Sequence, residues 1–263
     1  MFKNKLLISS VFLLAIGLQA CKREGCTDPN ALNYDANANK DVGCIYEAVH
    51  EVEMHFHPYV HGDALFEGNT YTIEGVATTL NYCRFYVSNI RLVNAAGEEI
   101  VAPEHYLYVQ PDPDEYSLGD IPDGDYTAIR FDIGIDSATN HGDPSLYPLG
   151  DPLGAQSPNM HWGWLNGYIF LRIDGEADSN ADGTPDDAFE MHIGTDDFLV
   201  SVEIPYDLTV SDQTENIFHM DANWEQLFVG VDLANDNTSH TTDNLTLANI
   251  IKNNIPNFIQ AED

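Results

Sequence analysis

Hydrophobic and polar residues alternate along much of the chain beyond residue 48, which is the pattern of half-buried β-strands. Between residues 51 and 57 every second residue is apolar, and the residues between them are Glu or His. One face of this strand would therefore enter a core while the other carries polar side chains. Similar runs predict strands at 49–57, 70–77, 83–93, 105–109, 126–135, 168–174, 189–193, 198–204 and 217–220.

Helical periodicity is sparse. Residues 245–259 are the best candidate for a helix, with Asp243 as its N-cap and Pro256 as a late interruption, and residues 223–228 would make one or two turns. The stretch 136–159 is too long for a plain turn, so we expect a functional loop there. Many short strands and one terminal helix predict an all-β fold, a Greek-key β-sandwich or barrel with long loops and a short C-terminal helix.

The first twenty residues resemble an export signal. Lys3 and Lys5 precede an apolar run at 6–18, which is too short for a comfortable membrane span and ends in a small-residue cleavage site directly before Cys21. This ending resembles the bacterial lipobox, which implies removal of residues 1–20 and diacylation of Cys21. We therefore expect an exported lipoprotein, anchored to the outer membrane and facing the periplasm or the cell surface. The alternative is an ordinary secretory signal with an incidental cysteine.

Three cysteines remain after the expected lipid anchor. An oxidising compartment favours a disulfide between Cys26 and Cys44, which bracket an Asn-, Asp- and Pro-rich loop with too few apolar residues for a core. The bracketed segment resembles a small module of bacterial surface proteins. We therefore expect a stapled module at residues 21–46 and a β domain at residues 47–263. Cys83 is left over, and its place in an apolar run predicts a buried thiol.

The charge balance restricts the partners. The chain has 43 acidic and 10 basic residues and a formal charge of −33, and loss of Lys3 and Lys5 makes the mature chain more acidic still. Nucleic acids and anionic membrane surfaces need a basic footprint, so we expect no nucleic acid and no membrane contact beyond the lipid anchor. Metal cations are the partners that such a negative charge favours. Hydrolase, metalloprotease, phosphate-loop and dinucleotide motifs are missing, so we do not expect an enzyme.

One loop has the spacing of a calcium site. Residues 178–186 read D-x-N-x-D-G-x-x-D, in which oxygen-bearing side chains alternate and a glycine permits a sharp turn. Phe189 stands where a helix–loop–helix calcium site has its bidentate carboxylate, so the loop resembles thrombospondin type 3 and dockerin repeats more closely. The alternative is a polar hairpin turn. The expected ligands of a structural calcium ion are Asp178, Asn180, Asp182, Thr184, Asp186 and Asp187.

Two of the three tryptophans lie beside a histidine, in the sequence HWGW at residues 161–164. The surrounding segment at 160–175, MHWGWLNGYIFLRIDG, resembles a signature of the MbnP-like family of methanobactin-associated periplasmic proteins. Three further segments resemble the same family in the same order: LNYCRFYVSNIRL at 80–92, SLGDIPDGDYTAIRFDIGI at 117–135 and FEMHIG at 189–194. The resemblance extends over residues 49–232.

This resemblance implies a copper-binding protein. Relatives include copper-repressible surface proteins of methane-oxidising bacteria, which bind Cu(I) through histidines and a tryptophan oxidised to kynurenine by a dihaem enzyme of the cytochrome c peroxidase type. Carried over to this chain, the resemblance makes His161, Trp164 and His192 the copper ligands, with Trp162 as the second choice for the modified tryptophan. Imidazole is a good copper ligand, and an oxidised indole gains a nitrogen or carbonyl donor. The implied partner is a dihaem peroxidase.

Two alternatives stay open at this point. If no copper binds, Trp162 and Trp164 would be core aromatics and the histidines structural groups. The chain would then be a calcium-stabilised, non-catalytic surface module for a carbohydrate or protein ligand, with both tryptophans and Tyr147 as an aromatic platform. His55 and His57, which share one face of the first strand, form a second and weaker candidate for a copper site.

The calcium prediction has a direct thermal test. If the loop at 178–187 holds a structural ion, removal of Ca²⁺ with a chelator should lower the melting temperature, because an ion that binds only the folded state stabilises that state. The measurement is a thermal melt with and without chelator. An unchanged melting temperature would contradict a structural calcium ion.

Overall fold

The chain forms two compact units, with the boundary between Glu47 and Ala48. The computed structural model describes residues 22–104, 106–112, 115–163 and 166–262. The predicted signal peptide, the expected lipid anchor at Cys21, and Trp164 lie outside the described residues. Within the part of the chain that is described, no helix has both the length and the apolar character to cross a bilayer.

The amino-terminal unit is held together by a disulfide and by polar turns. Strands β1 (Glu24–Gly25) and β2 (Lys40–Asp41) pair in parallel, and a disulfide joins Cys26 to Cys44. Aspartate side chains in the loop accept hydrogen bonds from backbone N–H groups two residues further along, which closes Asx turns. Because the covalent staple restricts the unfolded chain, a unit of this size needs little apolar contact.

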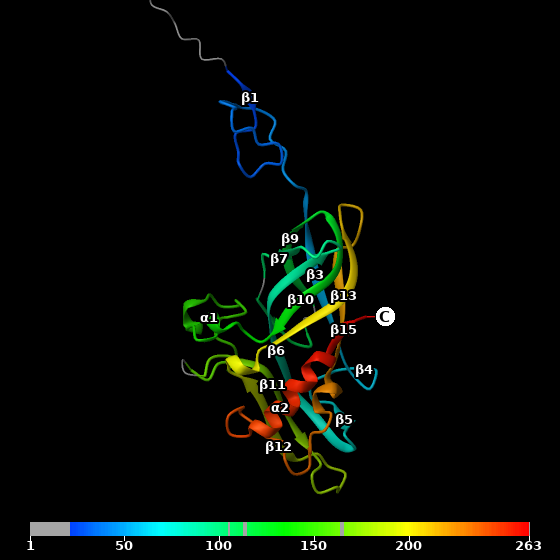
Figure 1. Cartoon of the computed structure of the whole chain (residues 1–263). Helices are drawn as coiled ribbons and strands as arrows, with labels where there is room; N and C mark the ends of the chain where they lie inside the picture. Colours follow the sequence, from blue (N-terminus) through cyan, green and yellow to red (C-terminus); the bar gives the residue numbers. More distant parts are fainter. Residues whose placement is uncertain (1–21, 105, 113–114, 164–165, 263) are drawn as a thin grey trace, which may run out of the picture. The chain divides into compact units, whose positions relative to one another are not determined.

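The larger unit consists mainly of strands (Figure 1). Its strands are β3 (Val49–Val60), β4 (Asp63–Ala64), β5 (Thr70–Ile73), β6 (Val76–Asn94), β7 (Glu99–Val101), β8 (Tyr106–Val109), β9 (Glu115–Pro122), β10 (Gly124–Ile133), β11 (Ile169–Ala177), β12 (Asp187–Gly194), β13 (Val200–Val210), β14 (Ile217–Asn223) and β15 (Ile259–Ala261). Its helices are α1 (Ser137–Asn140) and α2 (Leu245–Asn254), with 3-10 turns η1 (Pro144–Leu146), η2 (Asp196–Phe198), η3 (Trp224–Phe228) and η4 (Ile255–Asn257).

These strands form two sheets. The first has the order β12-β11-β6-β10-β13, and the short strands β5, β7 and β8 also pair with β6. The second has the order β15-β14-β3-β4, with β9 paired to β3. Neighbours run antiparallel except β3 and β14, which are parallel. The two sheets and the short helix α2 near the C-terminus confirm the predicted all-β sandwich.

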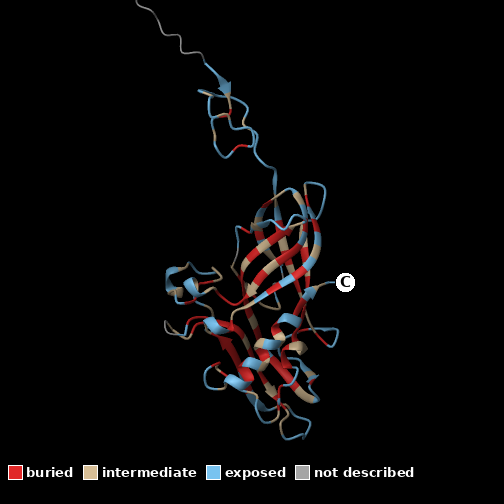
Figure 2. Cartoon of the chain, in the orientation of Figure 1, coloured by how far each residue is buried: buried red, intermediate tan, exposed pale blue. Residues whose placement is uncertain are grey.

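The core lies between the two sheets, where alternate residues of the strands are buried (Figure 2). On β3 the apolar residues Val52, Met54 and Phe56 are at most 1% exposed, as the alternation predicted. Phe56 meets Phe85 of β6 edge to face, with ring centroids 5.5 Å apart, and Phe85 meets Trp224 at 6.0 Å. These contacts bring β3 of one sheet against β6 of the other, so the polar side chains of β3 are directed outward.

Several strand boundaries differ from the prediction, and the strands β4, β7, β9 and β15 were not predicted. Residues 70–77 are not one strand, because Glu74 and Gly75 have φ angles of +50° and +81° and turn the chain from β5 into β6. The residues Gly119 and Pro122 of β9 are typical of turns, yet both belong to the strand that pairs with β3.

The C-terminal helix is shorter than predicted. α2 ends at Asn254, Pro256 lies in the turn η4, and the chain then extends as β15 beside β14. Proline lacks the N–H that another helical turn requires. The N-cap is Asn244 and not Asp243 as predicted, because the Asp243 carboxylate is engaged by His240.

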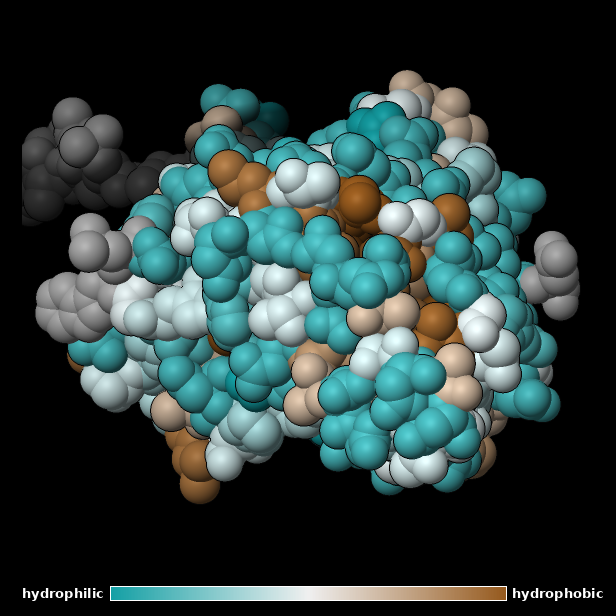
Figure 3. Space-filling view, turned by 90° about the horizontal axis from the view of Figure 1, so that it is seen from below, coloured by the Kyte–Doolittle hydropathy of each residue, from teal (hydrophilic) through white to brown (hydrophobic). Residues whose placement is uncertain are grey.

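The hydrophilic surface agrees with the large number of acidic residues in the chain. Figure 3 shows a face covered mostly by hydrophilic residues, with hydrophobic residues in small groups. Acidic side chains on such a surface remain solvated.

Phe56→Ala tests the contact between the sheets. Removing this buried ring should lower the free energy of unfolding by about 3–5 kcal/mol, because the neighbouring rings cannot fill the cavity completely. Chemical denaturation measures the change. Phe66→Ala is the matched control, since Phe66 is 63% exposed, and it should change the free energy by no more than about 0.5 kcal/mol. Equal effects of the two substitutions would contradict this description of the core.

Candidate functional site

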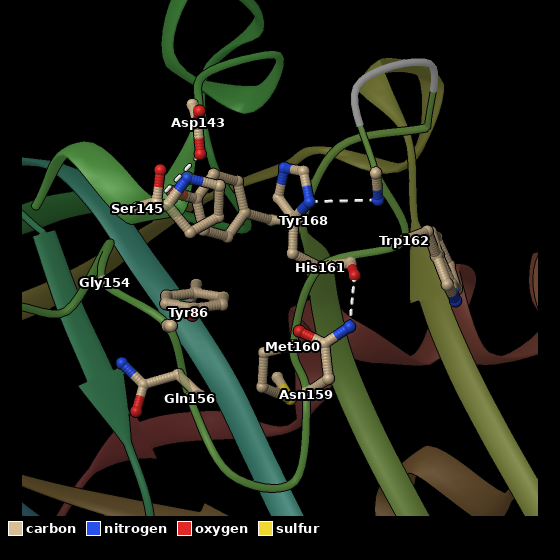
Figure 4. A pocket seen from close by; sticks show the side chains of 13 residues that line it. Tyr86, Asp143, Ser145, Gly154, Gln156, Asn159, Met160, His161, Trp162 and Tyr168 are labelled. Carbon is tan, nitrogen blue, oxygen red and sulfur yellow. Dashed lines mark hydrogen bonds between the residues drawn. The ribbon is translucent and has the colours of Figure 1, made fainter.

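The segment before β11 forms a short hairpin with the start of that strand. The N–H of Trp162 donates to the Gly167 carbonyl and the N–H of Ile169 donates to the Met160 carbonyl, both at 2.9 Å. Neighbouring residues of an extended segment point to opposite sides. Figure 4 shows the ring of His161 and the indole of Trp162 directed away from each other. These two adjacent candidates therefore have different surroundings.

His161 faces a hollow of about 410 Å³, which we call the His161 hollow (Figure 4). Its ring lies edge-on to Tyr168, with centroids 4.7 Å apart, and only 8% of the residue is exposed. Burial lowers the pKa of His161, and the Gly142 backbone and the Asp143 carboxylate offset this shift only in part. The ring is therefore neutral near pH 7. Other residues that line the hollow are Tyr86, Ser145, Gln156, Met160 and Trp162.

Two buried polar atoms in the His161 hollow have no hydrogen-bond partner among the described residues, His161 Nε2 and the Tyr86 hydroxyl. The N–H of Gly163 donates to His161 Nδ1 at 3.0 Å, so the proton of the neutral ring is on Nε2. Metal-bound histidines usually donate from the nitrogen that does not hold the metal. A metal ion at Nε2 would therefore require the Gly163 N–H to turn away, and the present geometry is that of a hydrogen-bond donor.

His192 has different neighbours. It lies on β12 opposite Arg172 of β11, and its Nε2 is 2.7 Å from Oδ1 of Asp174. Arg172 binds the other oxygen of the same carboxylate at 2.6 Å. Burial alone would raise the pKa of Asp174, but the hydrogen bonds from His192 and Arg172 hold it below its usual value. The ionised carboxylate therefore fixes the orientation of the His192 ring.

A loop that precedes α2 covers His192. The N–H of Ser239 donates to the Glu190 carbonyl and the N–H of His192 donates to the Ser239 carbonyl, both at 2.8 Å. This pairing brings His240 against His192, with ring centroids 4.9 Å apart and planes at 86°. His240 Nδ1 lies 2.9 Å from Asp243 and its Nε2 lies 3.0 Å from Glu190. Burial alone would lower the pKa of His240, but the two carboxylates raise it above its usual value.

Glu190, His192 and His240 form one of three groups of described residues whose possible metal-ligand atoms all lie within 4.8 Å of one another. A second group contains the disulfide cysteines, which cannot act as thiolate ligands. The third is on β3 and β14 and is taken up below. Among the described residues His161 belongs to none of these groups. His161 and His192 therefore do not share one of these three groups.

Trp162 lies on the side of His240. A Cβ added at Gly194, which ends β12, would lie 2.8 Å from Cζ3 of the indole. Trp162 also borders a hollow of about 300 Å³ together with Asn166, His240 and Asp243. We call this the Trp162 hollow. The structure therefore places Trp162 beside His240 of the His192–His240 pair. Trp164 is outside the described residues.

The loop predicted to bind calcium is closed by its own hydrogen bonds. Asp178 accepts from the backbone N–H groups of Asp182 and Gly183, both at 2.9 Å, and Asp182 accepts from that of Thr184. Asn180 accepts from the N–H of Asp182 as well. The same contacts are typical of a polar turn and of a cation loop, so calcium binding stays a prediction.

His240, Glu190 and Asp174 are the residues of this region that the sequence did not indicate. Glu190 and His192 are two residues apart on one strand, so their shared face could have been inferred from alternation. His240 could not, because it reaches β12 only through the pairing of Ser239 with that strand.

Tyr86→Phe tests the unpaired hydroxyl in the His161 hollow. We expect the free energy of unfolding to stay unchanged or to rise by about 1 kcal/mol, because a buried hydroxyl without a partner costs desolvation energy. Tyr108→Phe is the matched control. Its hydroxyl bonds to that of Tyr82 at 2.7 Å, so its loss should destabilise the protein by about 1 kcal/mol. Chemical denaturation of both variants distinguishes them, and a larger loss for Tyr86→Phe would reveal a bound partner of that hydroxyl.

Comparison with known proteins agrees with the fold and with the segments described above. The family model for MbnP matches residues 49–243, more than half of the chain. Among solved structures the chain is similar to MbnP from Methylosinus trichosporium, with a TM-score of 0.52 and 17% sequence identity over 71% of this chain and 80% of that one. At this identity the structural match shows the shared fold alone. No curated protein matches the chain. The extent of the family match, together with the common fold, shows that the chain belongs to the MbnP family.

Proposed function

We propose that this MbnP-family protein binds copper between His192 and His240, beside Trp162, and catalyses no reaction itself. The observation that carries the proposal is the meeting of the two imidazole rings, 4.9 Å apart between centroids, within reach of the Glu190 carboxylate. Imidazole nitrogen binds copper well in either common oxidation state. Two histidines from separate segments of the chain can therefore hold one ion where β12 meets the loop before α2.

One nitrogen of His192 and both nitrogens of His240 lie next to a carboxylate, since His240 Nε2 is 3.0 Å from Glu190. Asp174 binds Nε2 of His192 and Asp243 binds Nδ1 of His240. Metal-bound histidines commonly donate their second N–H to a carboxylate, which fixes the ring and makes the other nitrogen a better donor. The copper ligands would then be His192 Nδ1 and His240 Nε2, with the ion taking the place of the contact between His240 Nε2 and Glu190. Because the carboxylates raise the pKa of His240, we expect copper binding to release a proton from that ring.

Among the described tryptophans, Trp162 is the one whose position fits a modification next to this pair. It is half-buried and borders the Trp162 hollow with His240. Conversion to kynurenine would cleave the C2–C3 bond of the indole, with an oxygen atom added to each carbon, and water would then hydrolyse the N-formyl group and release C2 as formate. This leaves a carbonyl and an aromatic amine as new donors. The oxidising equivalents would come from a partner of the dihaem cytochrome c peroxidase type. The proposal also includes export and lipid anchoring at Cys21.

The alternative is a calcium-stabilised surface module for a carbohydrate or protein. It would use the tryptophans and Tyr147 as an aromatic platform, but Tyr147 lines a different hollow, with Tyr106 and Asp151. Trp162 and Tyr147 therefore border different hollows. Unmodified tryptophan together with quenching of its fluorescence by glycans would favour this alternative.

Copper titration of His192→Ala and His240→Ala tests the proposed ligands. Each substitution should weaken Cu(I) affinity by at least about tenfold, the lower end of what removal even of a residue behind a ligand costs. Competition with a chromogenic Cu(I) chelator measures the affinity. His161→Ala is the matched control, since its ring lies in the His161 hollow. Loss of affinity in His161→Ala, with none in the other two variants, would contradict the assignment. Peptide mass spectrometry after co-expression with a dihaem peroxidase would show whether Trp162 carries the mass of kynurenine.

A further inference from the structure

We propose a second metal site on the outer face of the β3–β14 pair, formed by His57, His219 and Glu262, for a divalent transition-metal ion of the zinc–copper class. It is separate from the proposed copper site and does not depend on it. Neither His219 nor Glu262 has a sequence neighbour that would mark it as a ligand. Their association with His57 is a product of the fold.

The parallel pairing of β3 and β14 assembles the site. Its register places His55 opposite His219 and His57 opposite Asp221. All of these residues are on the outer face, because the inner face of β3 is filled by the apolar core. Glu262 follows β15, which pairs with β14, and its N–H donates to the carbonyl of His219 at 3.0 Å. The pairing of these backbone segments thus fixes the positions of all three ligand residues.

The three ligand atoms lie close to the separations that a tetrahedral ion requires. His57 Nε2 is 3.2 Å from His219 Nδ1, and these atoms are 3.8 Å and 3.7 Å from Oε2 of Glu262. Metal–ligand bonds of about 2.0–2.1 Å at tetrahedral angles put ligand atoms about 3.3–3.4 Å apart. A shift of a few tenths of an ångström would therefore close the three atoms around one ion.

Neighbouring side chains support the orientation of His219. The ring of His55 meets that of His219 edge to face, with centroids 5.3 Å apart and planes at 80°. His55 is held in turn by Glu53, whose carboxylate lies 2.8 Å from Nε2. His55 therefore acts as a positioning residue and not as a ligand. This changes the role of the His55–His57 pair, because only His57 points its nitrogen at the other two ligands.

The site is accessible and has room for a further ligand. The side chains of His57, His219 and Glu262 are 39%, 37% and 46% exposed. A hollow of about 460 Å³ adjoins His57 and is bordered by Tyr59 and Asp221. Three protein ligands leave the fourth position of a tetrahedral ion to water or to an exogenous ligand.

The donor set decides the class of ion. Two imidazole nitrogens and one carboxylate oxygen suit Zn²⁺ and Cu²⁺, whereas Ca²⁺ and Mg²⁺ prefer a shell of oxygens. Zn²⁺ and Cu²⁺ share this chemistry, and Cu²⁺ binds such donors more tightly. Competition between the two ions in the same titration distinguishes them.

The test is a calorimetric titration of the full mature chain with Zn²⁺. A His192→Ala background removes a ligand of the proposed copper site, so that the remaining binding can be assigned. In this background we expect one Zn²⁺ per chain, and adding His219→Ala or His57→Gln should weaken its binding by at least about tenfold. Co²⁺ should give the strong visible absorption of a tetrahedral ion in the parent and lose it in both variants.

His61→Ala in the same background is the matched control. His61 is an exposed histidine of the turn after β3 that pairs with Glu225, and its removal should leave the isotherm unchanged. Equal isotherms for His219→Ala and His61→Ala, or no Zn²⁺ binding in the parent, would overturn the proposal. Thermal melts show that each variant is folded. Since His57 and His219 lie on different strands, loss of binding in both variants with intact melts cannot be ascribed to damage of one strand.

Discussion

The apolar contact between the two sheets is the constraint on which the rest of the structure depends. Phe56 of β3 and Phe85 of β6 meet in the core, and alternate residues of their strands follow them inward. Since successive side chains of a strand point to opposite faces, this burial directs the histidines and glutamates of β3 outward. On β12 the same alternation buries Met191 in the core and leaves Glu190 on the outer face with His192, where the loop before α2 covers His192.

Both candidate metal sites are built by the same principle. A strand with alternating polar residues supplies the first histidine, and a segment from much later in the chain supplies the second. In one site the loop before α2 brings His240 to His192, and in the other β14 brings His219 to His57. A carboxylate stands next to each pair. The large negative charge of the chain thus contributes only through a few local groups, while most acidic residues remain on the solvated surface.

The fold class could be predicted well because alternation and turn residues are local signals. The strands β3, β10 and β12 lie close to the predicted runs, and four segments resembled the family to which the chain belongs. The boundaries were less certain where one residue type fits two structures. Asn244 and Asp243 can both cap a helix, and only the pairing of Asp243 with His240 decides between them. Gly119 and Pro122 are typical of turns, but they are tolerated in β9.

The sequence by itself determined the sheet-forming segments, the Cys26–Cys44 pair as the candidate disulfide and the histidine–tryptophan segment as a candidate site. It could not determine which histidines meet. His161 and Trp162 are adjacent in the chain, yet an extended backbone sends their side chains to opposite sides. His192 and His240, and likewise His57 and His219, meet only because particular strands and loops pair in one register. Register is set by the burial of whole strand faces, which is a property of the tertiary structure and not of any short motif.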